Sequence, residues 1–328
     1  MTTTGTSTQG SAAAGGPAPG GPASGGPASG GPASGGPASG GVVAAGAASG
    51  PARVTTFSFA TEFRRQASRP RTRIALAFMV LLPLIILIAF EFGGGGDDDN
   101  NGGGAFSSLV DLATAGGANF ALFTLLVSSS FLVIVVIALF FGDTVASEAS
   151  WGSLRYLLAI PVPRARLLGV KLVVSMTYGA LALILLVGTA LVAGTLRYGW
   201  HPLRSTIADQ IGSGEAVLRI GGATAYIAVT LLVVASLAFL LSVSTDAPLG
   251  AVGGAVLLNI LSSILDQITA LGSIRSFLPT HYNDAWVGLL STPIQYDSMI
   301  RGSIAAIGYA VLFFGLAFWR FLRKDIVS

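Results

Sequence analysis

The sequence predicts an all-α, polytopic membrane protein with six transmembrane helices. Three observations lead to this prediction. Of the 328 residues, 52% are of apolar types and only 10% are charged, and the mean hydropathy is +0.74. The few charged residues also leave long charge-free intervals between them. A soluble domain carries about 25% charged residues. The composition therefore excludes an ordinary soluble enzyme.

The charge-free intervals define the expected spans. A charge at the centre of a membrane helix costs roughly 2.5–3.5 kcal/mol, and a bilayer core of about 30 Å needs about 20 apolar residues. Six intervals qualify: residues 74–90, 112–142, 172–196, 220–245, 247–265 and 302–319. A shorter apolar run at residues 285–296 predicts an interfacial or re-entrant segment.

The first 52 residues form a separate region. They contain a repeated GGPAS unit and few side chains that can pack in a core. Such composition predicts a disordered Gly/Pro/Ala/Ser-rich tail, with a linker or protein-binding role as an alternative. Residues 53–328 form the six-span domain. The start of the chain has neither the basic end nor the apolar core of a secretory signal.

The distribution of basic residues predicts the orientation. Arginine and lysine gather before the first span, between the second and third spans, and after the sixth. The positive-inside rule then places both termini in the cytoplasm, in a multi-pass protein of the cell inner (plasma) membrane. The basic inner face is accounted for by the bilayer, so we expect no nucleic-acid partner.

Several kinds of chemistry are excluded or disfavoured. The chain has no cysteine, and its two histidines, His201 and His281, belong to no metal-ligand motif. Neither Lys171 nor Lys324 lies in a Walker A loop, so we do not expect this chain to hydrolyse ATP through a P-loop. We also expect no other cofactor, no metal and no catalytic residue in this chain. The Gly/Asp/Asn run at residues 93–104 lacks the spacing of a calcium loop.

Two groups of polar residues lie in or near the predicted spans. Asp143, Asp246 and Asp266 each lie at a span end, and we expect interface residues rather than ion-coupling sites. Three serines, Ser128 to Ser130, lie within the second span without a histidine to act as base. We expect them to bond the backbone or aid helix packing.

An amphipathic segment precedes the first span. In residues 57–73, Phe59 and Phe63 are one helical turn apart, Arg64 and Arg65 follow, and Pro70 separates the segment from the span. The pattern predicts an N-terminal amphipathic elbow helix on the inner leaflet.

A second amphipathic segment joins the second and third spans. On a helical wheel, Glu148, Gly152 and Arg155 share a polar face, and the opposite face is apolar. The apolar face is formed by Trp151, Leu154, Leu157 and Leu158. Such a helix suits a membrane surface or a groove in a partner, and Pro161 and Pro163 end it.

The same segment resembles a known family. Glu148 is followed by WGSLR at residues 151–155, by paired leucines at 157–158, by PVPR at 161–164, and by LL with a lysine at 167–171. This order is similar to that of type-2 ABC transporter permeases, the membrane subunits of ATP-binding-cassette exporters. The usual serine before the arginine is Pro163 here. The likeness covers about residues 55–328, and arginine-rich usage suggests a bacterium with a GC-rich genome.

The resemblance implies an export permease that pairs with a second permease copy and binds a separate ABC ATPase subunit. ATP and magnesium would be held by that partner, in keeping with the missing Walker loop. The cytoplasmic coupling helix would seat in a groove of the ATPase. The residues expected to couple to the ATPase are Glu148, Trp151, Gly152, Leu154, Arg155, Leu158, Pro161 and Arg164. Because the spans offer no charged pocket, a hydrophobic or amphipathic substrate is expected.

The sequence also fits other functions, and some residues fit other roles. The chain fits a membrane scaffold or assembly protein without transport activity, or an intramembrane enzyme that uses the serines of the second span. Glu148 and Arg155 also fit a solvated surface pair, and Trp151 fits a membrane-interface anchor.

Overall fold

The computed structural model describes residues 58–93, 105–150, 163–204 and 210–323, all within one unit, Val54–Ser328. These residues form helices and connecting turns, with one isolated bridge between Leu203 and Ile211. The predicted tail and nearly all of the predicted coupling helix lie outside the described residues. The α-helices are α1 (Phe59–Ser68), α2 (Pro70–Gly93), α3 (Ala105–Thr114), α4 (Gly117–Ser129), α5 (Leu132–Ser150), α7 (Arg164–Tyr198), α8 (Ser213–Ser244), α9 (Pro248–Gln267) and α10 (Asp297–Arg323), and two 3-10 helices are η1 (Thr269–Phe277) and η2 (Ala285–Leu290).

The prediction of six spans in an all-α protein is confirmed. Among the described residues, six helices are long and apolar enough to cross a membrane: α2, α5, α7, α8, α9 and α10. The predicted charge-free intervals overlap closely with five of these helices, α2, α7, α8, α9 and α10. The apolar run at residues 285–296 contains the short η2, which is too short to span.

The second span differs from the prediction. Residues 112–142 were expected to form one helix, but α4 ends at Ser129 and α5 begins at Leu132. The hydroxyl of Ser128 donates to the carbonyl of Thr124, and those of Ser129 and Ser130 donate to the carbonyl of Leu126. Side-chain bonds of this kind compete with the helical ladder and bend helices. The interval is also longer than the roughly 25 residues that a tilted span uses.

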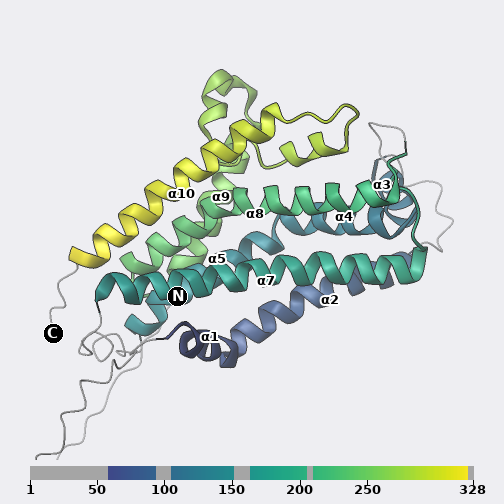
Figure 1. Cartoon of the computed structure of the whole chain (residues 1–328). Helices are drawn as coiled ribbons and strands as arrows, with labels where there is room; N and C mark the ends of the chain where they lie inside the picture. The colour runs from purple at the N-terminus through teal and green to yellow at the C-terminus, as the bar shows by residue number, and fades with distance from the viewer. Residues whose placement is uncertain (1–57, 94–104, 151–162, 205–209, 324–328) are drawn as a thin grey trace, which may run out of the picture. The chain divides into compact units, whose positions relative to one another are not determined.

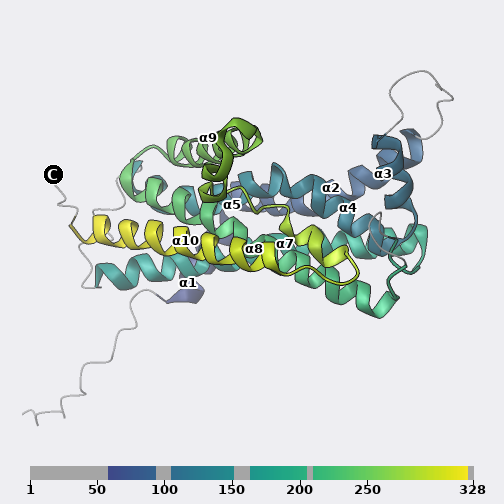
Figure 2. The ribbon, with the colours of Figure 1, turned by 90° about the horizontal axis from the view of Figure 1, so that it is seen from above.

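The helices pack around α5, α7 and α8. Helix α8 packs extensively against α10 and α5, α7 against α4 and α2, and α5 against α9. Figures 1 and 2 show α4 and α5 following one another alongside α7 and α8, with α3 at one end of the bundle and α1 at the other. The last turn of α10 and the first turn of α7 lie at the same end as α1. The largest buried side chains include Phe120, Phe140, Tyr178 and Phe239.

The first turn of α4 requires a glycine. A Cβ atom at Gly117 would lie 2.6 Å from the backbone nitrogen and 2.7 Å from Cα of Thr195 on α7. Backbone atoms cannot move aside as a flexible side chain can. The small residue therefore permits the close approach of α4 and α7, as small residues do in membrane bundles.

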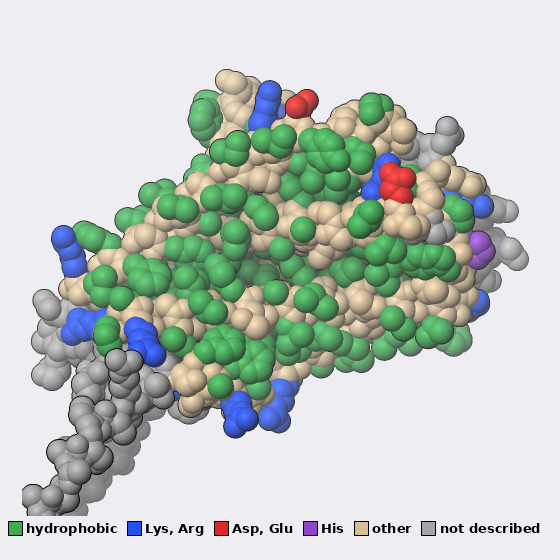
Figure 3. Space-filling model, viewed as in Figure 1, with side chains coloured by type: hydrophobic (Ala, Val, Ile, Leu, Met, Phe, Trp, Pro, Cys, Tyr) green, Lys and Arg blue, Asp and Glu red, His purple; other side chains and the backbone are tan. Residues whose placement is uncertain are grey.

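The outer faces of several helices are apolar. Leu257 and Ile264 of α9 are 67% and 56% exposed, and Val311 of α10 is 67% exposed. Figure 3 shows hydrophobic side chains over the length of the bundle, with most of the visible lysine and arginine at the end that carries α1. Apolar surface of this extent favours a lipid environment.

The elbow helix is confirmed as a helix separate from the first span. Helix α1 ends at Ser68, and Pro70 begins α2, where its missing N–H costs no hydrogen bond. The ring of Phe63 stacks on Tyr178 of α7, with centroids 4.7 Å apart, and the Tyr178 hydroxyl donates to the Phe63 carbonyl at 2.8 Å. Helix α1 is thus fixed against α7.

Candidate functional site

Lys171 lies at the centre of a buried group of charges where α1, α5 and α7 meet. Its ammonium nitrogen donates to Glu62 Oε1 of α1 at 2.9 Å and to Glu148 Oε1 of α5 at 2.5 Å. Their side chains are 0%, 4% and 3% exposed, respectively. Moving each charge out of water costs several kcal/mol, which opposite charges offset only when the geometry is good. The lysine therefore ties three helices together electrostatically.

Arg65 adds a second cation to this group. Its guanidinium pairs with Glu148 Oε1, and its Nε lies 3.3 Å from Glu62 Oε2, one turn earlier on α1. The Arg65 side chain is 38% exposed, so it reaches the buried carboxylates from the surface. The two glutamates thus share two cations, one buried and one partly solvated.

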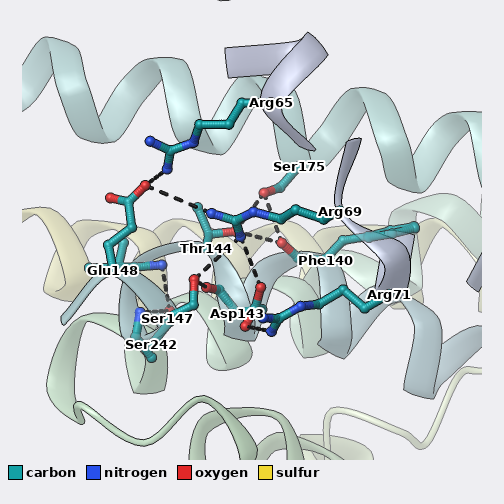
Figure 4. Close-up of polar contacts among 12 residues, drawn as sticks. Arg65, Arg69, Arg71, Phe140, Asp143, Thr144, Ser147, Glu148, Ser175 and Ser242 are labelled. Atoms are coloured by element: carbon teal, nitrogen blue, oxygen red, sulfur yellow. Dashed lines mark hydrogen bonds and ion pairs between the residues drawn. The ribbon is translucent and has the colours of Figure 1, made fainter. Parts of the chain in front are cut away.

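Two arginines at the junction of α1 and α2 surround Asp143 of α5. The Nη1 atom of Arg69 lies 3.0 Å from Asp143 Oδ2 and donates to Ser147 Oγ at 3.3 Å, while Arg71 pairs with Asp143 Oδ1. Burial lowers the pKa of the Arg69 guanidinium below its ordinary value, and the Asp143 carboxylate offsets part of this shift. Figure 4 shows Arg69 between the Glu148 side and the Asp143 side of the group.

These contacts form one network, which we call the charge cluster. It consists of Glu62, Arg65, Arg69, Arg71, Asp143, Glu148 and Lys171.

Hydroxyl groups join α5 to α7 and α8 beside the cluster. Thr144 Oγ1 lies 2.8 Å from Ser175 Oγ of α7, and Ser242 Oγ of α8 accepts bonds from the backbone amides of Val145 and Ala146 at 3.0 Å each. These bonds are buried and are drawn in Figure 4. The last two turns of α5 are therefore held on one side by charges and on another by hydroxyls.

A hollow of about 400 Å³ opens beside the cluster. It is lined by Arg65, Ser68, Arg69, Pro70, Arg71, Ser147 and Glu148. Its walls come from the junction of α1 and α2 and from the end of α5.

The surroundings of Glu148 differ from the sequence prediction. The helical wheel placed Glu148 on a polar face open to solvent or a partner, but its side chain is buried against Lys171 and Arg65. The wheel considers one helix alone. It does not include α1 and α7, which cover this side of α5 and supply the opposite charges.

The other predicted coupling residues are described only in part. Arg164 is the first residue of α7 and is half-buried, directly after Pro163. The remaining ones lie outside the described residues: Trp151, Gly152, Leu154, Arg155, Leu158 and Pro161.

The prediction that Asp143 closes the second span is wrong. It lies inside α5, which continues to Ser150, and its side chain is 2% exposed. Arginines at the α1–α2 junction pair with this carboxylate, so the charge has partners within the protein. Asp246 is exposed between α8 and α9, and Asp266 lies at the end of α9, 2.6 Å from Nδ1 of His281.

Sequence reasoning missed the role of Glu62 and Arg69. Glu62 lies 109 positions before Lys171, and Arg69 lies 74 positions before Asp143. No local pattern reports pairs so far apart. One signal was available: Glu62 is an acidic residue inside a basic amphipathic helix. A carboxylate is repelled by an anionic membrane surface, so its presence there suggests a partner inside the protein.

The serines of the second span behave as predicted, since each donates to a backbone carbonyl one turn earlier. Within the described ranges, no group of three or more histidine, aspartate or glutamate side chains is arranged to hold a metal ion.

The family described as "Protein of unknown function (DUF2705)" matches residues 105–327, which is more than half of the chain. The chain belongs to the DUF2705 family. No curated protein matches the chain significantly.

The DUF2705 match divides the charge cluster. Asp143, Glu148 and Lys171 lie inside the matched region, whereas Glu62 and the arginines precede it. In this DUF2705 protein the cluster is suited to holding helix ends in a fixed arrangement or to switching between two arrangements by exchanging partners.

Proposed function

We infer that this protein is the membrane-spanning permease subunit of an ABC exporter. It forms the translocation pathway in the plasma membrane, with both termini in the cytoplasm, and is driven by an ATPase subunit on a separate chain. The sequence motif between Glu148 and Lys171 suggests this function. The observation that carries it is the direct contact between these two residues, which flank the proposed coupling segment.

The contact provides a route for force. Glu148 lies in the last turn of α5 and Lys171 in the third turn of α7, so both helix ends that border residues 151–162 meet in one buried pair. Glu62 extends the link to α1. Breaking one partner from a buried pair costs about 3–5 kcal/mol. A push on the coupling segment would therefore move α1, α5 and α7 together rather than bend one helix end.

This assignment changes the role of Glu148. We propose that it anchors the coupling segment to the bundle, while the residues from Trp151 to Pro161 contact the ATPase. Motion of a rigid group between two packed arrangements is the usual basis of such switching.

An apolar groove on the bundle suits an apolar cargo. A hollow of about 270 Å³ between α5, α7 and α8 is lined only by apolar side chains and glycine, among them Phe141, Met176, Gly179, Leu183 and Leu232. This lining supports a hydrophobic or amphipathic substrate. The exposed apolar faces of α2, α9 and α10 leave area both for lipid and for a second permease copy.

A crosslinking experiment tests the proposal. Because the chain has no cysteine, Leu154→Cys provides a unique thiol for a photoreactive crosslinker in native membranes. Azido-ATP then labels nucleotide-binding chains. We expect a crosslinked product that carries the ATP label on a separate polypeptide, and none from the control Ile307→Cys on α10, which is 49% exposed. Absence of an ATP-labelled product, or equal products from both variants, would contradict the permease assignment and favour a scaffold.

A further inference from the structure

A further cavity lies beside α3, at the end of the bundle opposite the charge cluster. It has a volume of about 150 Å³ and lies between α3, α4 and η2. Its apolar walls include Ala113 of α3, Leu122 and Phe123 of α4, and Val287 of η2. A cavity of this volume with apolar walls accepts a benzene-sized group.

One residue of the lining has a buried hydrogen-bond donor without an acceptor. Trp286 lines the cavity, its side chain is 2% exposed, and its indole Nε1 has no hydrogen-bond partner among the described residues. Buried polar groups are normally hydrogen-bonded, and leaving one unsatisfied costs stability. An acceptor atom supplied by a ligand would remove this cost.

The wall that holds this donor is firmly fixed. Arg219 of α8 donates to the carbonyls of Leu289 and Ser291 at 2.7 and 3.2 Å, which fastens η2 to the spans. On the other side, Asn119 of α4 exchanges two hydrogen bonds with the backbone of Arg204, at 2.7 and 3.1 Å. The cavity therefore lies between two anchored walls, which favours its persistence.

A cation lies at the same cavity. Arg204 borders it with an exposed side chain, and no ion pair of Arg204 occurs among the described residues. Asn119 bonds only the backbone of Arg204, so the guanidinium can pair with a negatively charged ligand.

We propose that this cavity binds an anionic amphipath through a small apolar group and an acceptor oxygen. The apolar group fills the space between α3 and α4, a turn of the indole presents the covered Trp286 N–H to the oxygen, and the negative charge faces Arg204. A membrane lipid and a free amphipathic acid share this chemistry. The site does not depend on the proposed transport activity.

Hexanoate is a suitable probe, since it combines a short alkyl chain with a carboxylate. The full chain in a neutral detergent is labelled with ¹⁵N at the indole nitrogens of its four tryptophans, and the Trp286 signal is identified by its loss in Trp286→Phe. We expect hexanoate to move the Trp286 signal alone, and hexylamine, which has no acceptor in its charged form, to leave it in place. No shift at any hexanoate concentration up to solubility, or equal shifts with both compounds, would overturn the proposal.

Calorimetric titration separates the contributions of the Trp286 N–H and of the Arg204 guanidinium to binding. Trp286→Phe keeps an aromatic ring but removes the donor, and we expect hexanoate affinity to fall about tenfold or more, because bonds to charged groups are the stronger ones. Arg204→Gln should weaken hexanoate but not hexanol. Trp319→Phe on α10, at the far end of the bundle, is the matched control and should bind as the native protein does.

A filled cavity provides an independent check. Ala113 is 1% exposed, and Ala113→Leu should abolish binding while the other indole signals stay in place; Ala113→Val serves if the larger residue prevents folding. In nanodiscs, a Trp286 signal already shifted by phosphatidylglycerol and unresponsive to hexanoate identifies lipid as the ligand. A signal that responds to hexanoate in such nanodiscs identifies a free amphipath. Retained binding in the filled variants would contradict the site.

Discussion

Glu148 and Lys171 stand on either side of the proposed coupling segment and meet at 2.5 Å in the interior, with both side chains almost fully buried. The pair is unusual in that a second carboxylate, Glu62, binds the same ammonium group. One lysine on α7 thus holds α1 and the end of α5, which are distant in sequence.

Removal of the lysine should destabilise the protein strongly. Lys171→Met removes the buried cation and leaves the two buried carboxylates to Arg65, which is partly exposed, and to Arg69, which lies 4.0 Å from Glu148; we expect a loss of about 3–5 kcal/mol. Combining it with Glu62→Leu and Glu148→Leu removes the unpaired charges, so most of the stability should return. Thermal unfolding in detergent measures both effects. A triple variant that is less stable than the single one would show that the carboxylates have other, stronger roles.

Asp143 should contribute to stability in a way that surface aspartates do not. Asp143→Asn removes the negative charge between Arg69 and Arg71 and leaves two neighbouring cations without their shared partner. We expect a lower unfolding temperature. Asp111→Asn on the exposed side of α3 is the matched control and should change it little. Equal unfolding temperatures for the two variants would indicate that Asp143 is not ionised in the folded protein.

The sequence predicts the spans better than it predicts the charge cluster. The spans follow from the high cost of charge in hydrocarbon, so their positions are encoded locally, and the predicted positions hold for five of the six; the second predicted interval ends inside α5. The break between α4 and α5 is also local, in Ser128 to Ser130, but its signal is weak because serines are tolerated in straight membrane helices. The pairing of Glu62 with Lys171 depends on how α1 packs against α7, and nothing in the neighbourhood of either residue encodes it.

The orientation of the bundle is testable with single cysteines. The positive-inside rule predicts that Arg323, at the end of α10, faces the cytoplasm and that Gln210, before α8, faces outward. Since the chain has no cysteine, Arg323→Cys and Gln210→Cys each introduce one thiol. A membrane-impermeant maleimide should label Gln210→Cys in intact cells or spheroplasts and Arg323→Cys only in inverted vesicles. The reverse pattern would place the charge cluster on the outer side and remove the basis for an internal ATPase.

Close packing of α4 on α7 should make Gly117 sensitive to the smallest substitution. A methyl group there would overlap the backbone of Thr195, so α4 would have to shift, and we expect Gly117→Ala to cost about 1–3 kcal/mol. Gly188→Ala, on α7, is the matched control, because a Cβ at Gly188 meets no atom within 4 Å. Alanine favours a helix over glycine by about 1 kcal/mol, so the control should be neutral or more stable. The two variants should therefore move the unfolding temperature in opposite directions or differ clearly in size. Similar behaviour would mean that α4 adjusts to the extra atom, and the contact would then not fix the position of its first turn.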